Sequence, residues 1–236
     1  MAIYVPGYPQ FGGTQINTAA IRNVIAQAGL HNPATQEPFS EAMIVGLSGG
    51  VGFRYTSAHG RSPPFPLLSG HYEHPQHDPL RRVLARLGAQ LQVHETGSRR
   101  SAQQALMATL QSGSPALCVV STAHLPHHGR PADVRRLPHQ LVAVVGAEDG
   151  HVFVDDVCDR SIPMGAAQLL DARSALRRLR HRQFTVTSGG PSAGALATFR
   201  AGIRAALHIE NVADTIFVDI LQAFAVTSVP KAREFA

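Results

Sequence analysis

Residues 137–160 read LPHQLVAVVGAEDGHVFVDDVCDR, and this stretch decides the fold. The apolar run over 141–145 predicts a buried strand, a turn rich in Gly and acidic residues follows, and residues 152–154 predict a second strand. The hairpin starts with His139 and ends with Asp155. A hairpin of this length can bring the two side chains together as the base and the orienting carboxylate of a nucleophile–His–Asp triad.

A triad of this kind also needs a nucleophile, normally a cysteine at the start of an N-terminal helix. A helical period over residues 17–28 predicts that helix, with Thr14 or Asn17 as its cap. Thr14, Gln15 and Ile16 stand where the nucleophile is expected, and this part of the chain contains no cysteine. The function of the chain therefore depends on whether another group at this position replaces the cysteine nucleophile.

The composition is that of an ordinary globular protein with few charges. Its 236 residues are 44% hydrophobic and 16% charged, which fits one domain with an appendage. No apolar run reaches the roughly 18 residues that span a bilayer, and the N-terminus lacks the features of a signal peptide, so we expect a cytoplasmic location without membrane contact. Cys118 and Cys158 lack metal spacing and are expected to be free thiols; no cofactor is expected.

The order of predicted elements indicates an α+β fold, because helices come first and an antiparallel sheet with one late helix follows. We predict helices over residues 40–47, 80–87, 101–110 and 166–179, strands over 91–94, 115–121 and 183–187, and a loop over 56–79. A linker at 189–192 separates a domain over residues 1–188 from a C-terminal helical segment over residues 189–236. An appended helical pair of this kind favours a homodimer.

Much of the net charge of +5 lies in one segment, Ser174–Gln183, which contains four arginines and follows Arg173. A basic patch attracts an acidic partner. The segment lacks interleaved aromatic residues and nucleic-acid-binding motifs, so we expect no nucleic acid there. Two interpretations remain: a docking surface for an acidic carrier protein, or a solvated helix end whose arginines complement the helix dipole.

Several segments, in this order, resemble the N-terminal family of butirosin biosynthesis protein H, a group of papain-like cysteine acyltransferases. The resemblance covers about 180 positions and rests on the segments TAAIRNVIAQAGL (18–30), SEAMIVGLSGGVGFRY (40–55), LRRVLARLGAQLQVHETG (80–97), CVVSTAHLPHHGRP (118–131), HQLVAVVGAEDGHVFVDD (139–156) and QLLDAR (168–173). The resemblance implies a papain-like domain that transfers an acyl group from a carrier-protein thioester to an amine.

The resemblance carries over for His139 and Asp155 and fails for the nucleophile. The family places a His-Cys pair at the head of its first helix, where this chain has Thr14, Gln15 and Ile16. A second departure is Ser121, where the resemblance implies an aspartate.

Three hypotheses for the chemistry follow. In the first, the hydroxyl of Thr14 or Thr18 replaces the thiol, with Cys158 as a more distant substitute. In the second, His139 and Asp155 act on an amine or water without a covalent intermediate, and Gln15 with the helix N-terminal amides stabilises the oxyanion. In the third, the fold binds a partner without turnover. We expect transfer, cyclisation or hydrolysis of a carrier-bound thioester, with the non-catalytic subunit as the alternative.

Other chemistry-bearing residues have a simpler interpretation. The histidines at 71, 74 and 77 have a spacing that could suit a metal, but neighbouring prolines favour a polar surface loop, and we predict no metal site. His124, His127 and His128 surround a proline in a loop that could touch substrate, although ordinary loop histidines are the simpler interpretation. Asp156 could replace Asp155 as the orienting carboxylate, because adjacent strand residues point to opposite faces and only one can face His139.

Overall fold

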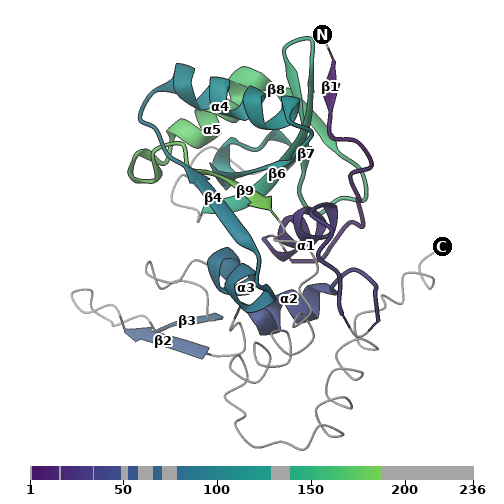
Figure 1. The fold of residues 1–236 in the computed structure, drawn as a ribbon. Helices are drawn as coiled ribbons and strands as arrows, with labels where there is room; N and C mark the ends of the chain where they lie inside the picture. Colours follow the sequence, from purple (N-terminus) through teal and green to yellow (C-terminus); the bar gives the residue numbers. More distant parts are fainter. Residues whose placement is uncertain are drawn as a thin grey trace, which may run out of the picture. The chain divides into compact units, whose positions relative to one another are not determined.

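The computed structural model describes residues 2–15, 17–33, 35–48, 53–57, 66–70, 79–128 and 139–187. Within these ranges the chain forms two compact units, one made of residues up to 31 together with 90–188, and another that contains residues 32–89. The predicted C-terminal helical segment, 189–236, lies outside the described residues. The hairpin of His139 and Asp155 belongs to the first unit (Figure 1).

The first unit is built on a seven-stranded antiparallel sheet with the order β4-β9-β5-β6-β7-β8, in which β1 also pairs with β6. The α+β fold class is confirmed. The strands are β1 (Ile3–Tyr4), β4 (Gln90–His94), β5 (Ala116–Ser121), β6 (His139–Glu148), β7 (His151–Asp155), β8 (Ile162–Gly165) and β9 (Gln183–Thr187). The helices are α1 (Thr18–Gln27), α4 (Arg99–Gln111) and α5 (Ala166–Ser174), with 3-10 turns η1 (Thr122–His124), η2 (Pro126–His128) and η3 (Arg177–Leu179).

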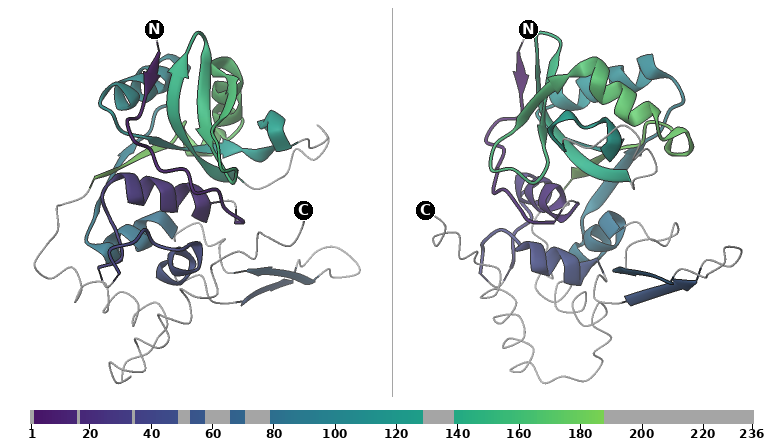
Figure 2. Two further views of the ribbon diagram at one scale, coloured as in Figure 1. Left: turned by 90° about the vertical axis from the view of Figure 1, so that its right-hand side faces the viewer. Right: turned by 180° about the vertical axis from the view of Figure 1, so that it is seen from behind.

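Helices cover β6 on both faces, which explains why its sequence is a nearly continuous apolar run rather than an alternating one. The even-numbered residues Val142 and Val144 join a core with Leu106 and Leu110 of α4 and Leu169 of α5. The other face is the one where α1 contacts β6 and β5. Figure 2 shows α1 and the α4–α5 pair as separate layers around the sheet.

A bulge in β6 between Val144 and Gly146 lets the N-terminal strand β1 pair with its end. A Cβ atom at Gly146 would lie 2.6 Å from the ring of Tyr4, so only glycine allows this close approach. The chain then runs beside the hairpin, where Val5 N–H donates to the carbonyl of Val145 and Gly13 N–H to that of Val157, both at 2.8 Å. The N-terminal segment is thereby fixed beside β6 and β7.

Most predicted elements are confirmed within a few residues. The predicted loop over 56–79 is wrong at residues 56–57 and 66–70, because β2 (Phe53–Ser57) pairs with β3 (Pro66–Gly70) in an antiparallel ladder. The predicted helix 166–179 ends earlier, at Ser174, and continues as the separate turn η3. The short strands β1 and β8 were not predicted, since two to four residues carry too little periodicity.

The described part of the second unit contains the ladder β2–β3 and two packed helices, α2 (Glu41–Leu47) and α3 (Pro79–Leu87). The Ser40 hydroxyl caps α2 by accepting the N–H of Met43 at 3.2 Å. The buried apolar side chains are Phe39, Met43, Ile44, Leu47, Leu80, Val83 and Leu84. In neither unit does a described helix combine the length and the apolar character that a membrane crossing requires.

Candidate functional site

The tip of α1 is capped by the side chain that stands near the expected nucleophile position. The Gln15 side-chain carbonyl accepts the backbone N–H of Thr18 at 3.2 Å and its hydroxyl at 2.8 Å. Asn17, one of the two residues predicted to cap this helix, makes no cap bond with its side chain. Its amide oxygen instead accepts the backbone N–H of Leu141 at 2.7 Å, which fixes the tip of α1 to β6 two residues from His139.

Asp155 is fully buried on the α1 face and is held by three donors. The Tyr8 hydroxyl donates to it at 2.6 Å, the Asn23 amide at 2.9 Å and the Gln10 amide at 3.4 Å. Burial raises the pKa of Asp155, and the hydrogen bonds from Tyr8 and Asn23 offset only part of that rise. Burial, together with the Asp155 carboxylate, raises the pKa of Tyr8 well above its ordinary value.

These partners of Asp155 were missed at the level of sequence. Asn23 belongs to the helix segment that carries the family resemblance, so its amide was a visible signal. Tyr8 and Gln10 gave no such signal, because they reach Asp155 only through the path that the N-terminal segment takes beside the hairpin.

The structure does not bring His139 and Asp155 into contact by a hydrogen bond. Asp155 pairs with Ala143 in the β6–β7 ladder, whereas His139 pairs with Ser121 at the far end of β6. Four residues of strand, at about 3.4 Å each, separate the two levels by roughly 14 Å. The imidazole of His139 is exposed and makes no hydrogen bond within the described part of the chain.

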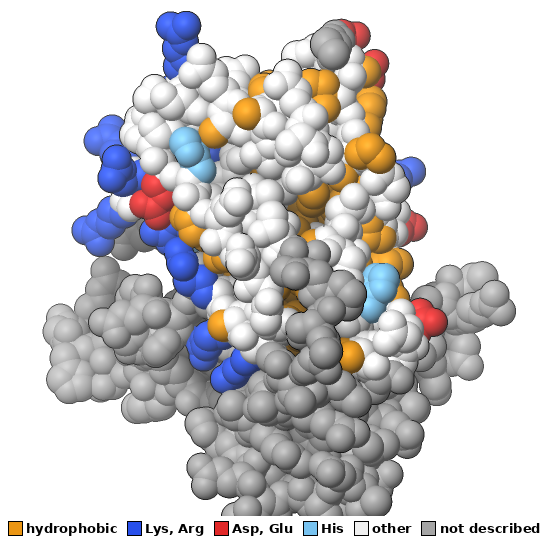
Figure 3. Space-filling model, in the orientation of Figure 1, with side chains coloured by type: hydrophobic (Ala, Val, Ile, Leu, Met, Phe, Trp, Pro, Cys, Tyr) orange, Lys and Arg blue, Asp and Glu red, His pale blue; other side chains and the backbone are white. Residues whose placement is uncertain are grey.

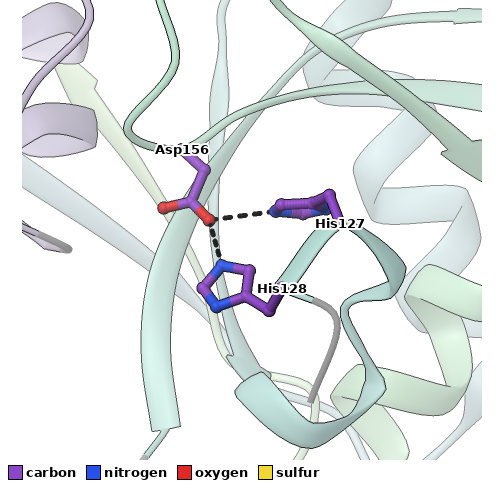
Figure 4. Close-up of side chains that lie close together, drawn as sticks. All are labelled: His127, His128 and Asp156. Atoms are coloured by element: carbon purple, nitrogen blue, oxygen red, sulfur yellow. Dashed lines mark hydrogen bonds and ion pairs between the residues drawn. The ribbon is translucent and has the colours of Figure 1, made fainter.

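Asp156 occupies the opposite face of the sheet, as the alternation of strand side chains predicts. Its Oδ2 atom lies 3.0 Å from Nε2 of His127, 2.7 Å from Nε2 of His128 and 2.9 Å from the Gln140 amide nitrogen (Figure 4). Burial alone would raise the pKa of Asp156, but the hydrogen bonds from the two histidines and Gln140 outweigh it and hold that pKa below its ordinary value.

The other predicted nucleophiles have different surroundings. Thr14 is exposed, and the Thr18 hydroxyl is buried and donates to the backbone and side chain of Gln15. The thiol of Cys118 belongs to the α4–α5 core, where burial raises its pKa. Cys158 is a half-buried free thiol two residues after Asp156. None of these groups bonds to His139 in the described part of the chain.

The basic segment divides into buried and exposed parts. Arg173 is not on the surface: its guanidinium is buried and donates to the carbonyl of His181 at 2.7 Å. Arg182 pairs with Glu95 at 2.6 Å. Exposed arginines of η3 and its flanks remain, and Figure 3 shows basic side chains along the left edge of the first unit. A pocket of about 340 Å³ lies here, lined in part by Arg99, Arg177, Arg180 and His181.

Some predicted residues fall outside the described ranges, namely the histidines at 71, 74 and 77. Of the loop histidines, His124 lies 3.2 Å from the Ser121 hydroxyl through Nδ1, whereas His127 and His128 both reach Asp156. The convergence of these two rings on one carboxylate was not predicted.

Comparison with models of known protein families shows which family the chain belongs to. The family described as butirosin biosynthesis protein H, N-terminal, matches residues 15–157, which is more than half of the chain. The chain belongs to this family. Its matched span begins at the cap of α1 and ends just after Asp156, so it contains the helix tip, His139 and both aspartates. No curated protein matches the sequence closely enough to serve as a second comparison. Membership in the butirosin biosynthesis protein H family relates the chain to antibiotic biosynthesis.

Proposed function

We propose that the chain is a non-catalytic subunit of secondary-metabolite biosynthesis that binds the acyl group of a carrier-protein thioester and forms no covalent acyl intermediate. The observation that carries the proposal is the Gln15 carbonyl at the head of α1. In a cysteine acyltransferase, the N–H groups at this end of the helix stabilise the thiolate and the oxyanion. Here a side-chain oxygen already accepts one of those N–H groups.

The Thr18 hydroxyl also argues against a covalent intermediate. An alcohol attacks a thioester only if a base removes its proton. The Thr18 proton is directed to the carbonyl oxygens of Gln15, at 2.8 Å and 3.3 Å, rather than to an imidazole. Acylation of Thr18 would therefore require the cap of α1 to open.

The state of Asp155 is the second argument for binding without turnover. A histidine base works well when a carboxylate fixes its tautomer and stabilises the imidazolium. Asp155 is instead bound by Tyr8 and Asn23, and its raised pKa disfavours the charged form that an imidazolium requires. His139 lacks that support.

A second candidate function is thioester transfer, cyclisation or hydrolysis with His139 as a lone general base. The observation that favours it is the bond between Asn17 and the backbone of Leu141, which holds the tip of α1 two residues from His139. An exposed imidazole there could deprotonate a small-molecule amine or water that attacks an activated thioester.

The basic pocket supports an acidic carrier protein as the partner. Carrier proteins present their acyl group on a phosphopantetheine arm, and arginine side chains bind phosphate and carboxylate groups well. Arg177 and Arg180 line the pocket and are exposed, so they are available to an approaching acidic surface.

The test uses an acyl-pantetheine thioester, with and without an amine, on the wild-type protein and on His139→Ala. We expect saturable binding by calorimetry to both proteins, and thioester loss no faster than in buffer. Thioester loss that is faster with wild type and falls to the buffer rate in His139→Ala would replace the proposal with the second candidate. Failure of the thioester to bind to either protein would overturn both.

A further inference from the structure

The strongest feature that the proposed function does not use is the cluster formed by His127, His128 and Asp156. The histidines come from the turn η2, and the carboxylate follows β7, 28 and 29 residues further along the chain. One nitrogen from each ring and one carboxylate oxygen lie within 4.8 Å of one another. Figure 4 shows both rings turned toward the same oxygen.

Convergence of two adjacent histidines is unusual for a turn of this kind. Successive side chains on a 3-10 helix point about a third of a turn apart, so neighbours normally diverge. Here the ring centroids of His127 and His128 are 4.7 Å apart with planes at 66°, and both Nε2 atoms reach Oδ2 of Asp156. Two imidazole nitrogens and a carboxylate oxygen are a ligand set that Zn²⁺ prefers.

Hydrogen bonding alone leaves this cluster incompletely satisfied. Oδ2 of Asp156 faces three donors, since Gln140 also donates to it at 2.9 Å. The Oε1 atom of Gln140, whose amide nitrogen contacts the same carboxylate, is buried and has no partner among the described residues. Buried polar atoms without partners are uncommon and often mark a missing ligand.

Two of the three spacings in this cluster, those between an imidazole nitrogen and the carboxylate oxygen, are close to those of a zinc site. Zinc–nitrogen and zinc–oxygen bonds of about 2.0–2.1 Å in a tetrahedron place the ligand atoms about 3.3 Å apart. The two imidazole–carboxylate distances are 3.0 Å and 2.7 Å, so outward shifts of these side chains by a few tenths of an ångström would make room for the ion. The carboxylate is almost fully buried, while the two rings retain partial exposure, through which an ion can enter.

We propose that His127 and His128, each through Nε2, and Asp156, through Oδ2, bind one Zn²⁺ ion, with water or the Gln140 oxygen as the fourth ligand. The site joins the loop after β5 to the end of β7 on the α4–α5 face. It is separate from the tip of α1, and it does not depend on the proposed acyl binding.

The experiment titrates chelator-treated, untagged protein with Zn²⁺ alone in a calorimeter, and with Co²⁺ for the visible spectrum of its coordination sphere. We expect one tight equivalent of Zn²⁺, tetrahedral Co²⁺ absorption and a higher thermal midpoint with Zn²⁺. Removal of a ligand in His128→Ala should weaken binding by about 100-fold or more, because second-shell losses alone cost up to that much. The matched control, His151→Ala, removes the exposed histidine at the start of β7 and should bind as wild type does.

Two further variants keep the outcome decisive. His127→Gln retains a polar side chain, so its loss of Zn²⁺ with an unchanged far-UV spectrum separates ligation from folding. His74→Ala tests the other histidine-rich segment. Binding that survives His128→Ala and His127→Gln, or that is lost only in His74→Ala, would overturn the proposal, as would a wild-type protein that binds no tight equivalent.

Discussion

Two neighbouring aspartates lie on opposite faces of the sheet, and their pKa values are shifted in opposite directions. Asp155 faces α1 and accepts hydrogen bonds from a phenol and two amides, all of them neutral donors. Asp156 faces the α4–α5 side and contacts two imidazoles that can carry positive charge. Both carboxylates are buried, yet the pKa of Asp155 is raised and that of Asp156 is lowered.

The difference shows that hydrogen-bond partners decide the direction in which the pKa of a buried carboxylate shifts. Desolvation is the largest single influence on both groups, and it acts in the same direction on each. The histidines add charge-assisted hydrogen bonds on one face only. The face that carries His139 therefore holds a carboxylate whose pKa is raised, while the other face holds one whose pKa is lowered.

The largest effect is expected from Asp156→Asn. Loss of the charge leaves two histidines and Gln140 facing a neutral amide, so the free energy of unfolding should fall by about 2–3 kcal/mol. Urea unfolding at pH 7 in the presence of a chelator measures it, so that no metal contributes. An unchanged midpoint would show that the cluster on this face does not need a negative charge.

The isosteric change on the other face, Asp155→Asn, should act in the opposite direction. An amide oxygen can still accept from Tyr8 and Asn23, and the change removes the cost of charging a buried group, so stability at pH 7 should stay level or rise by up to about 1 kcal/mol. The same urea series gives the comparison. A loss as large as that of Asp156→Asn would remove the contrast between the two faces.

Tyr8→Phe sharpens the account of the α1 face. Removal of the hydroxyl leaves the Asp155 carboxylate with one donor fewer, which should cost about 1 kcal/mol of unfolding free energy. In the Asp155→Ala background the same change should cost much less, and this double-mutant cycle isolates the pair. Equal costs in both backgrounds would mean that the hydroxyl does not act through Asp155.

A smaller, pH-dependent effect is expected from His181, which lines the basic pocket. Burial, followed by the charges of Arg173 and Arg99, lowers the pKa of His181 below its ordinary value. The neutral ring therefore contributes stability above about pH 6.5 that is lost as the pH falls through the lowered pKa of the folded state. His181 has a φ of 50°, which asparagine also tolerates. The stability difference between wild type and His181→Asn should shrink between about pH 7 and pH 5, and a constant difference would contradict the shift.

Much of the fold could be predicted because hydrophobic periodicity marks α1, β5, β6 and β7 directly. The opposite orientation of Asp155 and Asp156 also follows from strand alternation alone. The partners of each carboxylate could not be predicted in the same way. They depend on the ladder register, in which Asp155 pairs with Ala143, and on the bulge beside Gly146 that brings the N-terminal segment alongside.

The sequence predicted which residues belong to the candidate site better than it predicted how their side chains are arranged. The missing thiol is visible in the sequence, and so are His139 and the aspartates. The cap by Gln15 was not predicted, because glutamine is not a preferred capping residue and local propensity favoured Thr14 or Asn17. The approach of His127 and His128 to one oxygen depends on side-chain directions in a short turn, which no periodic pattern encodes.

The central claim is that the chain binds an acyl thioester and forms no covalent acyl intermediate at the tip of α1. The most direct measurement is the intact mass of the wild-type protein after incubation with an acyl-pantetheine thioester, with Gln15→Cys and Ile16→Cys as reference variants that restore a thiol to the tip. We expect wild type to keep its unmodified mass and at least one cysteine variant to gain one acyl group. An acyl adduct on wild type, mapped to Thr14 or Thr18, would contradict the claim.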